Sequence, residues 1–391
     1  MVEYCVYRRG ASLEDLGVLC EDCHASVAGL IPPGFLWEED CFRLAPRAQP
    51  GPPHLWGLTR FGQNINDEWF IVHLLLRLSH RFPDLLISLH DSDGEFLLIE
   101  AALSLPKWLN PETSRNRIWI SNGTIHIIPL PKNPTEMLII PDGEDLDVAR
   151  ALEIVGKKLV RTEANQGVQE AIGRRAEEAR EEAGKSAHYA RCRVPRDIAY
   201  LLQERPQLAA YAVNAYYYRD TIQMKVCRKM ERFPARDCGE HVLRLSRCLY
   251  AQLLRQELDF VPFGYEAVPP NTPKTALLYK SVSMGHKLAS GFEVLYQDLK
   301  RNAKKKGQNV NNVHNIPIPN IVETIDELLS REERFLHQNS ERNADSDDWL
   351  NISPEEVEDI ISRKQKELDV MLEQEKKKME KKKEEEKERE K

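Results

Sequence analysis

The sequence lacks long hydrophobic runs. Its longest apolar stretches, such as Ile71–Leu78, are broken by His73 and Arg77 and are too short to span a bilayer. Aromatic residues make up only 7% of the 391 residues, but 41% are hydrophobic and 30% are charged. This composition excludes a collagen-like, wholly disordered or integral membrane chain, and about 150 residues per domain predicts two or three domains.

The chain also lacks an excess of basic residues. It has 55 Lys and Arg against 62 Asp and Glu, which gives a formal net charge of -7. An acidic chain is poorly suited to broad electrostatic capture of nucleic acid, so we do not expect direct nucleic-acid binding, although a local basic patch is compatible with this charge. The sequence shows no secretory signal, and its eight scattered cysteines suit a reducing compartment, so we expect an intracellular protein.

Common catalytic signatures are missing as well. The sequence contains no G-x-S-x-G elbow, no Walker loop, no G-x-G-x-x-G and no H-E-x-x-H motif, and its eleven histidines are dispersed. These absences favour a protein that is not an enzyme, with no cofactor, no metal site and no catalytic residues.

Residues 1–142 predict a mixed α/β domain with antiparallel hairpins. Ser12 and Asp15 have the spacing of a capping box at the start of a helix, and a second, nearly buried helix begins near Asn66. Turn residues separate two pairs of apolar runs. The predicted strands are Val2–Tyr7, Leu85–His90, Glu95–Ala101, Arg117–Ser121 and Ile125–Ile128.

Residues 143–300 predict a mostly helical domain, which makes the fold class α+β. The expected helices are Leu146–Glu163, Gln166–Ala183, Pro195–Gln203, Gln207–Tyr218, Glu240–Glu257 and Lys280–Leu299. Residues 301–346 predict a flexible linker, and residues 347–391 a charged helix. Ser353, Pro354 and Glu356 give that last helix a strong start signal, after which it continues into Lys/Glu blocks.

Cys20, Cys23 and His24 fit the C-x-x-C-H pattern that attaches c-type haem. Both cysteines, however, lie on the apolar stripe of the first predicted helix, where a free cysteine behaves as a small hydrophobic residue. No second Cys/His pair completes a four-ligand zinc site. We therefore interpret these residues as part of the core.

The carboxylates around the first predicted hairpin have two interpretations. Asp91, Asp93, Gly94 and Glu95 could bind a metal ion, but Gly94 is misplaced for an EF-hand loop and a hairpin turn explains the same residues. Buried Glu68 and Glu100 could form an acid/base pair, which makes a carboxylate-based hydrolase built on Glu68, Asp91, Asp93, Glu95 and Glu100 the alternative function. The competing interpretation pairs Glu100 with Arg115 or Arg117.

A basic cluster follows the last predicted helix of the helical domain. Its members are Lys300, Arg301, Lys304, Lys305 and Lys306. In an exposed linker such a cluster indicates a nuclear import signal or a nucleic-acid contact, and a solvated linker explains it equally well. An RNA-associated factor that uses this cluster is therefore a further alternative.

Ser346 lies among acidic residues, between Asp345 and the pair Asp347 and Asp348. Phosphorylation would convert this segment into a dense anionic ligand for a basic pocket. Acidic-directed kinases favour such a context, although the residue three positions on is Trp349 rather than an acid. We predict a phospho-dependent docking site here.

Several stretches together resemble the ecdysoneless family of eukaryotic cell-cycle regulators. They are NINDEWFIV (64–72), DGEFLLIEAA (93–102), LPKWLN (105–110), residues 116–119, RPQL (205–208), the helix 212–220, RCLYAQLL (247–254), MGHKLASGFEVL (284–295) and DDWLNISPEEVEDII (347–361). The likeness covers most of residues 1–300 plus the last, short block.

The resemblance implies a non-enzymatic scaffold of the nucleus and cytoplasm. Its expected roles are in transcription regulation, cell-cycle progression and pre-mRNA splicing. The expected partners are spliceosomal and transcription-regulatory proteins and a co-chaperone complex with AAA+ ATPases, which reads phosphoserine in Asp-Ser-Asp-Asp contexts such as that of Ser346. The chain departs from the family in its short segment 300–345 and in its Lys/Glu end, so an activation function of that end is not carried over.

Overall fold

The computed structural model describes most of the chain. The described residues are 1–91, 94–96, 98–141, 146–305, 320–336, 343–351, 353–359, 361–363, 365–366 and 369, without the side chains of Glu95, Lys304 and Lys305. They form two units, Met1–Ala344 and Asp345–Lys391. Among the described residues, no helix is both long enough and apolar enough to cross a membrane.

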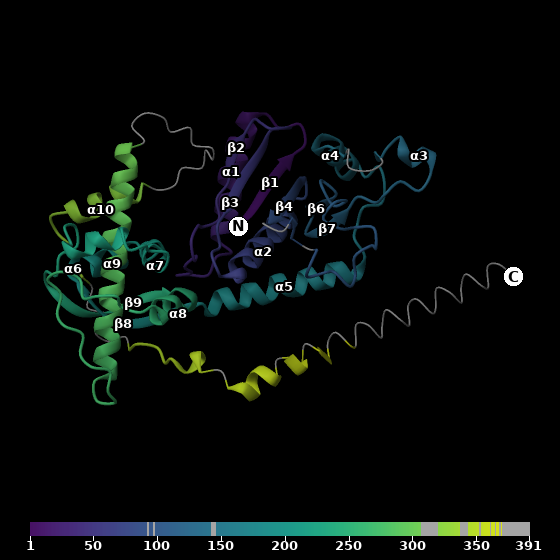
Figure 1. Ribbon diagram of the computed structural model, residues 1–391. Coiled ribbons are helices and arrows are strands. Elements are labelled where there is room, and N and C mark those ends of the chain that lie inside the picture. Colours follow the sequence, from purple (N-terminus) through teal and green to yellow (C-terminus); the bar gives the residue numbers. More distant parts are fainter. Residues whose placement is uncertain are drawn as a thin grey trace. The chain divides into compact units, whose positions relative to one another are not determined.

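An antiparallel sheet dominates residues 1–185, here called the N-terminal region (Figure 1). Its strands are ordered β2-β3-β1-β4-β6-β7, and β5 pairs with β4. The strands are β1 (Val2–Arg8), β2 (Ala45–Arg47), β3 (His54–Thr59), β4 (Leu85–Asp91), β5 (Gly94–Glu95), β6 (Ile118–Ser121) and β7 (Thr124–Ile127). Asn122 and Gly123 both have positive φ in the β6–β7 turn, as a two-residue hairpin requires.

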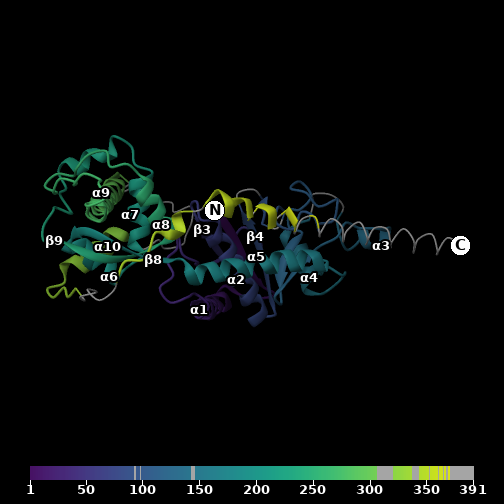
Figure 2. The ribbon, with the colours of Figure 1, turned by 90° about the horizontal axis from the view of Figure 1, so that it is seen from below.

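Each face of this sheet is covered by its own core, because side chains alternate along a strand. Val2, Tyr4 and Val6 of β1 join the larger core, whereas Tyr7 joins the smaller one. Helices α1 (Leu13–Ala28), α2 (Ile65–Arg81) and α5 (Gln166–Lys185) supply the larger core, and α4 (Val148–Gly156) supplies the smaller. Both views of the ribbon show α2 and α5 side by side (Figures 1 and 2).

The predicted capping box of the first helix is present. The Asp15 N–H donates to Ser12 Oγ at 3.2 Å, and the Ser12 N–H donates to Asp15 Oδ2 at 2.9 Å. Cys20 and Cys23 are buried in the larger core, as their interpretation as core residues requires. His24 accepts a hydrogen bond from the Leu44 N–H at 3.0 Å. These residues join α1 to the chain before β2.

Two predicted elements of the N-terminal region are wrong. The strand expected over Glu95–Ala101 reduces to β5, because residues 98–103 form turns that bury only part of this apolar run. The helix expected over Leu146–Glu163 ends at Gly156, and Lys158 then adopts a positive φ. The following chain turns back to the sheet, where the Ile127 N–H donates to the Thr162 carbonyl.

Residues 186–336, here called the middle region, combine helices with a two-stranded ribbon. The ribbon consists of β8 (Ala187–Pro195) and β9 (Cys238–Ser246). The helices are α6 (Arg196–Glu204), α7 (Leu208–Tyr217), η1 (Gln223–Arg228), α8 (Arg247–Arg255), α9 (Ala276–Lys305) and α10 (Ile321–Ser330). The short helix α3 (Pro134–Met137) belongs to the N-terminal region. α9 packs against β8, α7 and η1.

The middle region also corrects the sequence predictions. The single helix expected over Glu240–Glu257 is instead a strand followed by a helix, with Ser246 Oγ capping α8 through the Leu249 N–H at 3.1 Å. β8 has no counterpart among the predicted elements. α9 extends to Lys305, and α10 buries Ile325 and Leu328 within a segment predicted to be a flexible linker.

The unit Asp345–Lys391 contains η3 (Asp348–Leu350) and a helical turn that begins after Ser353. Its predicted cap is present, because the Glu356 N–H donates to Ser353 Oγ at 3.1 Å and the Ser353 N–H donates to Glu356 Oε2 at 2.8 Å. Ile352 of the predicted hydrophobic staple lies outside the described residues.

The fold class is α+β, as the sequence predicts. The division into domains stays a prediction. The predicted boundary at residues 142 and 143 separates α4 and α5 from the sheet, yet both helices pack on it and α5 supplies Val168 and Ile172 to its larger core.

Two glycines let α9 approach its neighbours closely. A Cβ atom at Gly285 would overlap the carbonyl of Arg193 in β8, and one at Gly291 would overlap the carbonyl of Ala212 in α7. Both obstacles are backbone atoms, which cannot rotate away.

Gly291→Ala should therefore destabilise the protein by about 1–3 kcal/mol, as overpacking does. Gly173→Ala in α5 is the matched control, because nothing lies within 4 Å of its Cβ position and alanine favours a helix. Urea denaturation of the full chain measures both. A Gly291→Ala protein as stable as Gly173→Ala would contradict the close contact.

Candidate functional site

The predicted docking serine lies in the unit Asp345–Lys391. Ser346 is exposed, and its Oγ accepts a hydrogen bond from the Asp348 N–H at 3.2 Å. Asp345 and Asp348 are also exposed, and Asp347 is half-buried. The hydroxyl is thus accessible and surrounded by carboxylates, which is the arrangement a phospho-dependent docking site requires.

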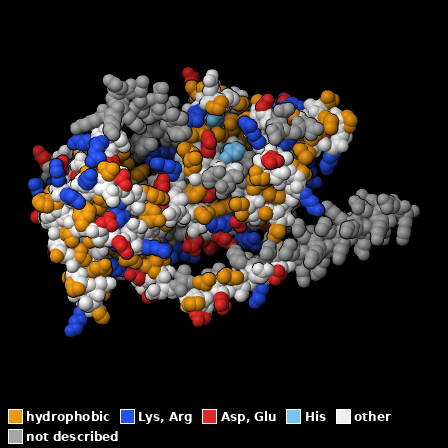
Figure 3. Space-filling model, in the orientation of Figure 1, with side chains coloured by type: hydrophobic (Ala, Val, Ile, Leu, Met, Phe, Trp, Pro, Cys, Tyr) orange, Lys and Arg blue, Asp and Glu red, His pale blue; other side chains and the backbone are white. Residues whose placement is uncertain are grey.

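The predicted basic cluster begins on α9 rather than in a linker. Lys300 lies 5.4 Å from the centre of the Tyr296 ring, and Arg301 pairs with Asp298 at 3.4 Å. The backbone of Lys304 and Lys305 continues the helix, whereas their side chains and all of Lys306 lie outside the described residues. On the face shown in Figure 3, basic and acidic side chains are interspersed.

The carboxylates of the alternative hydrolase have different surroundings. Glu68 is 7% exposed, and burial and then the neighbouring Asp91 raise its pKa to about 7. Glu100 is exposed, so the alternative in which Glu68 and Glu100 form a buried acid/base pair is wrong. Asp93 and the side chain of Glu95 lie outside the described residues.

The competing interpretation pairs Glu100 with Arg115 or Arg117. Arg117 lies in the core, whereas Glu100 is exposed. Arg117 donates to the carbonyls of Pro129 at 3.2 Å and Pro141 at 3.4 Å. Arg115 is exposed and lines a pocket on the sheet. In the part of the chain that is described, no three His, Cys, Asp or Glu residues are placed to hold a metal ion.

A junction between the N-terminal and middle regions unites several of the quoted sequence stretches. Trp37 and Gln207 exchange two hydrogen bonds, from the Trp37 N–H to Gln207 Oε1 at 3.2 Å and from Gln207 Nε2 to the Trp37 carbonyl at 2.9 Å. Asn214 Nδ2 donates to the Glu38 carbonyl at 3.0 Å, and Gln252 Nε2 donates to Glu38 Oε1. Gln207, which precedes α7, thus acts with side chains of α7 and α8 to hold the short segment that contains Trp37 and Glu38.

Asp67 of α2 lies on the other side of this segment. Its Oδ2 accepts from the Glu38 N–H at 2.8 Å, and its Oδ1 accepts from Asn64 Nδ2 at 2.8 Å. Asp67 is 2% exposed, and burial raises its pKa to about 8, opposed by the Glu38 N–H and supported by the charge of Glu38. A small cavity of about 80 Å³ adjoins Asp67 and Cys248. The junction therefore buries carboxyl groups.

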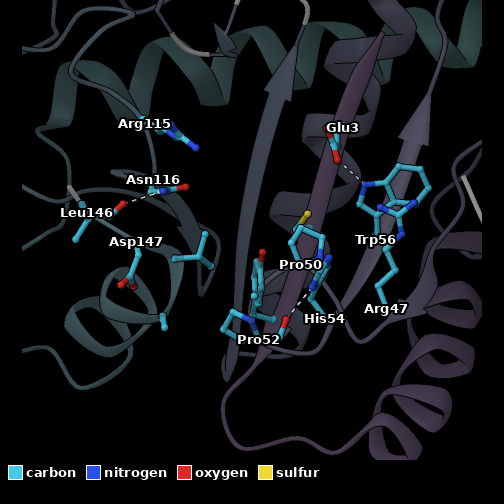
Figure 4. A pocket seen from close by; sticks show the side chains of 15 residues that line it. Glu3, Arg47, Pro50, Pro52, His54, Trp56, Arg115, Asn116, Leu146 and Asp147 are labelled. Atoms are coloured by element: carbon cyan, nitrogen blue, oxygen red, sulfur yellow. Dashed lines mark hydrogen bonds between the residues drawn. The ribbon is translucent and has the colours of Figure 1, made fainter. Parts of the chain in front are cut away.

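A larger pocket of about 610 Å³ lies on the opposite face of the sheet from α1 and α2 (Figure 4). Arg47 stacks over the Trp56 ring at 3.4 Å, and Trp56 Nε1 donates to Glu3 Oε1 at 2.5 Å. Arg115 and Asp147 lie across the pocket from Trp56, and Asn116 Nδ2 donates to the Leu146 carbonyl at 2.8 Å. Charges of both signs and aromatic rings suit a polar ligand with a flat group.

Neither the pocket nor the junction is evident from the sequence. The proline-rich segment 46–53 was visible in the sequence and supplies one pocket wall, but nothing along the chain indicates that it faces Arg115. Asp67 carried a clearer signal, since it is an acid at the start of a helix expected to be nearly buried.

Comparisons with known proteins identify the family. Residues 2–317 match the model of a family described as SGT1 protein. The ecdysoneless homologue of Arabidopsis thaliana is 33% identical over 72% of this chain and 44% of its own length. That of Schizosaccharomyces pombe is 31% identical over 84% of this chain and 52% of its own, and Drosophila melanogaster ecdysoneless is 32% identical over 68% and 41%.

The chain therefore belongs to the SGT1 protein family, here represented by ecdysoneless proteins, as the resemblance in its sequence implied. It spans about half or less of the length of the curated relatives it matches. No solved structure matches the chain.

Glu68→Gln should make the stability of the protein less dependent on pH. The folded pKa of about 7 lies above the ordinary value of 4.5, so the folded state binds more protons between these values and loses stability as the pH rises through them. Glutamine removes this loss, and the variant should gain about 1–2 kcal/mol on wild type between pH 5 and pH 8, allowing for partial screening. Urea denaturation across that range measures it, and an unchanged slope would contradict a buried acid.

Proposed function

We propose that the chain is a non-enzymatic adaptor of the ecdysoneless type. Its proposed roles are in transcription regulation, cell-cycle progression and pre-mRNA splicing, through contacts with spliceosomal and transcription-regulatory proteins and with a co-chaperone complex that contains AAA+ ATPases. It acts in the nucleus and the cytoplasm. Membership of the family supports this proposal.

The observation that carries the proposal is the exposure of Ser346 in a unit separate from the main cores. The serine is flanked by Asp345, Asp347 and Asp348, and its hydroxyl accepts a hydrogen bond from the backbone N–H of Asp348. A phosphate there would add roughly two negative charges to an acidic segment, which a pocket lined by Arg and Lys would bind through charge-assisted hydrogen bonds.

The surroundings of the carboxylates favour an adaptor over the alternative hydrolase. A general acid and a general base must reach the same substrate. Glu68 is almost fully buried beside Asp91, whereas Glu100 faces solvent. The two described glutamates of that hypothesis therefore do not share one buried site.

Affinity purification of the full chain from cells tests the docking site. Ser346→Ala should remove the chaperone subunits from the bound fraction, because the phosphate acceptor is lost, while splicing and transcription proteins remain. Mass spectrometry of the bound proteins provides the measurement, and phosphatase treatment of the wild type should reproduce the loss.

Ser353→Ala is the matched control in the same unit. It removes a helix cap, with a cost of about 1 kcal/mol, but leaves the acidic segment intact. If Ser353→Ala and Ser346→Ala lose the same partners, the effect is structural and the docking proposal is wrong. A wild-type chain that recovers no partner at all would contradict the adaptor function.

We also propose that the basic cluster that begins on α9 acts in nuclear import. The double variant Lys300→Gln and Arg301→Gln should lower the nuclear fraction of the protein, because import signals depend on positive charge. Fluorescence microscopy of the tagged chain measures this fraction. Lys225→Gln and Lys229→Gln, two exposed lysines of the same region, form the control and should leave the fraction unchanged.

A further inference from the structure

The pocket of Figure 4 lies on a part of the sheet that α4 does not cover. Because side chains alternate along β1, Glu3, Cys5 and Tyr7 point away from the larger core and line the pocket. Helix α4 packs over Leu86 of β4 and Trp119 of β6, and its first turn forms one pocket wall. The face at β1 and β3 thus carries a pocket of about 610 Å³, a size that suits a small ligand or a few side chains of a partner.

Arg47 and Trp56 form a flat platform in this pocket. The guanidinium carbon of Arg47 lies 3.4 Å from the centre of the Trp56 ring. Glu3 Oε1 accepts from Trp56 Nε1 at 2.5 Å, so the indole is held at its edge while the guanidinium covers its face. A guanidinium is planar and stacks well on aromatic rings. The platform therefore favours a ligand that packs an aromatic ring on Arg47.

Arg115 is a cation of the pocket with no ion pair and no side-chain hydrogen bond among the described residues. Figure 4 shows it on the opposite side of the pocket from Trp56. The two carboxylates of the pocket, in contrast, are engaged. Glu3 accepts from the indole, and Asp147 caps α4 through the Arg150 N–H at 2.7 Å. The charge that the pocket leaves unmatched is therefore positive.

We propose that the pocket binds a peptide segment of a partner protein in which an aromatic side chain lies close to a carboxylate. The aromatic ring packs on Arg47, and the carboxylate pairs with Arg115 on the opposite side. Tryptophan and arginine are among the residue types that contribute most to binding at protein interfaces. This recognition site is separate from Ser346 and requires no phosphorylation.

A nucleotide would also supply a flat ring and an anion, but the charges of the pocket favour a single carboxylate. Asp147 lies on the same side of the pocket as Arg115 and would repel a doubly charged phosphate more strongly than a carboxylate. His54 adds no positive charge near pH 7, because burial lowers its pKa and its Nδ1 already donates to the Pro52 carbonyl at 2.9 Å.

The edge of the sheet is poorly suited to the addition of a peptide strand. β2 is the edge strand beside the pocket, and it has only three residues. Pro46 at its centre has no N–H to donate. A strand added there would form few backbone hydrogen bonds, which are the source of affinity in that mode of binding. The specificity of the pocket therefore depends on side chains, above all on Arg47 and Arg115.

Nuclear magnetic resonance of the full chain, labelled with ¹⁵N, tests the proposal through its six tryptophan indole signals. The signal of Trp56 is assigned with Trp56→Phe. The probes are acetylated and amidated peptides in which aspartate and phenylalanine are joined by no, one or two glycines. At least one of them should shift the Trp56 signal and leave that of Trp349, in the other unit, unchanged. Asparagine in place of the aspartate should weaken binding about two- to fivefold, the effect of an exposed ion pair.

Arg115→Gln should remove the preference for the aspartate peptide over the asparagine peptide, because the paired cation is lost. Arg161→Gln is the matched control and should keep the preference, since Arg161 is also exposed but lines a different cavity of the same region. An unchanged Trp56 signal with every peptide would overturn the proposal. So would equal binding of the two peptides to the wild type, or tighter binding of adenosine monophosphate than of any peptide.

Discussion

The structure of residues 1–344 depends on how the segment with Trp37 and Glu38 is held. Trp37 packs in the larger core of the sheet, and the segment is bonded by Gln207, Asn214 and Gln252 of the middle region. Asp67 holds it from the other side through the Glu38 N–H. Glu38, Asp67 and Gln252 are all buried here, so the choice of partner side chains fixes the register of one region on the other.

This constraint explains why three separate sequence stretches share one location. Asn64 and Asp67 come from NINDEWFIV, Gln207 from RPQL and Gln252 from RCLYAQLL. Asn64 donates to Asp67 within one stretch, but Asp67, Gln207 and Gln252 each bond to the distant segment with Trp37 and Glu38. Their shared location is evident only in the folded chain, because a polar residue in a sequence does not indicate which distant group it contacts.

Much of the local structure could be predicted from the sequence. The capping boxes at Ser12 and Ser353, the Asn122–Gly123 hairpin and the helical stripe of α1 all depend on residues within a few positions of one another. β8 and β9 could not be predicted in this way, since Ala187 pairs with Ser246 far along the chain, and the stability of each strand comes from that partner. The helix predicted over 240–257 failed for the same reason. Glu100 was misjudged because the apolar run around it forms turns rather than a strand.

The two kinds of candidate site differ in what they require of the fold. The junction and the pocket of Figure 4 form only where distant segments pack together. Both therefore depend on the folding of the whole unit. Ser346 needs only to be exposed, and its hydroxyl accepts a hydrogen bond from the nearby Asp348 N–H. A phosphate on the exposed Ser346 would add negative charge to a segment that is already acidic, in a unit distinct from residues 1–344. The proposed docking at Ser346 therefore depends on local exposure and charge, whereas the junction and the pocket depend on the packing of distant segments.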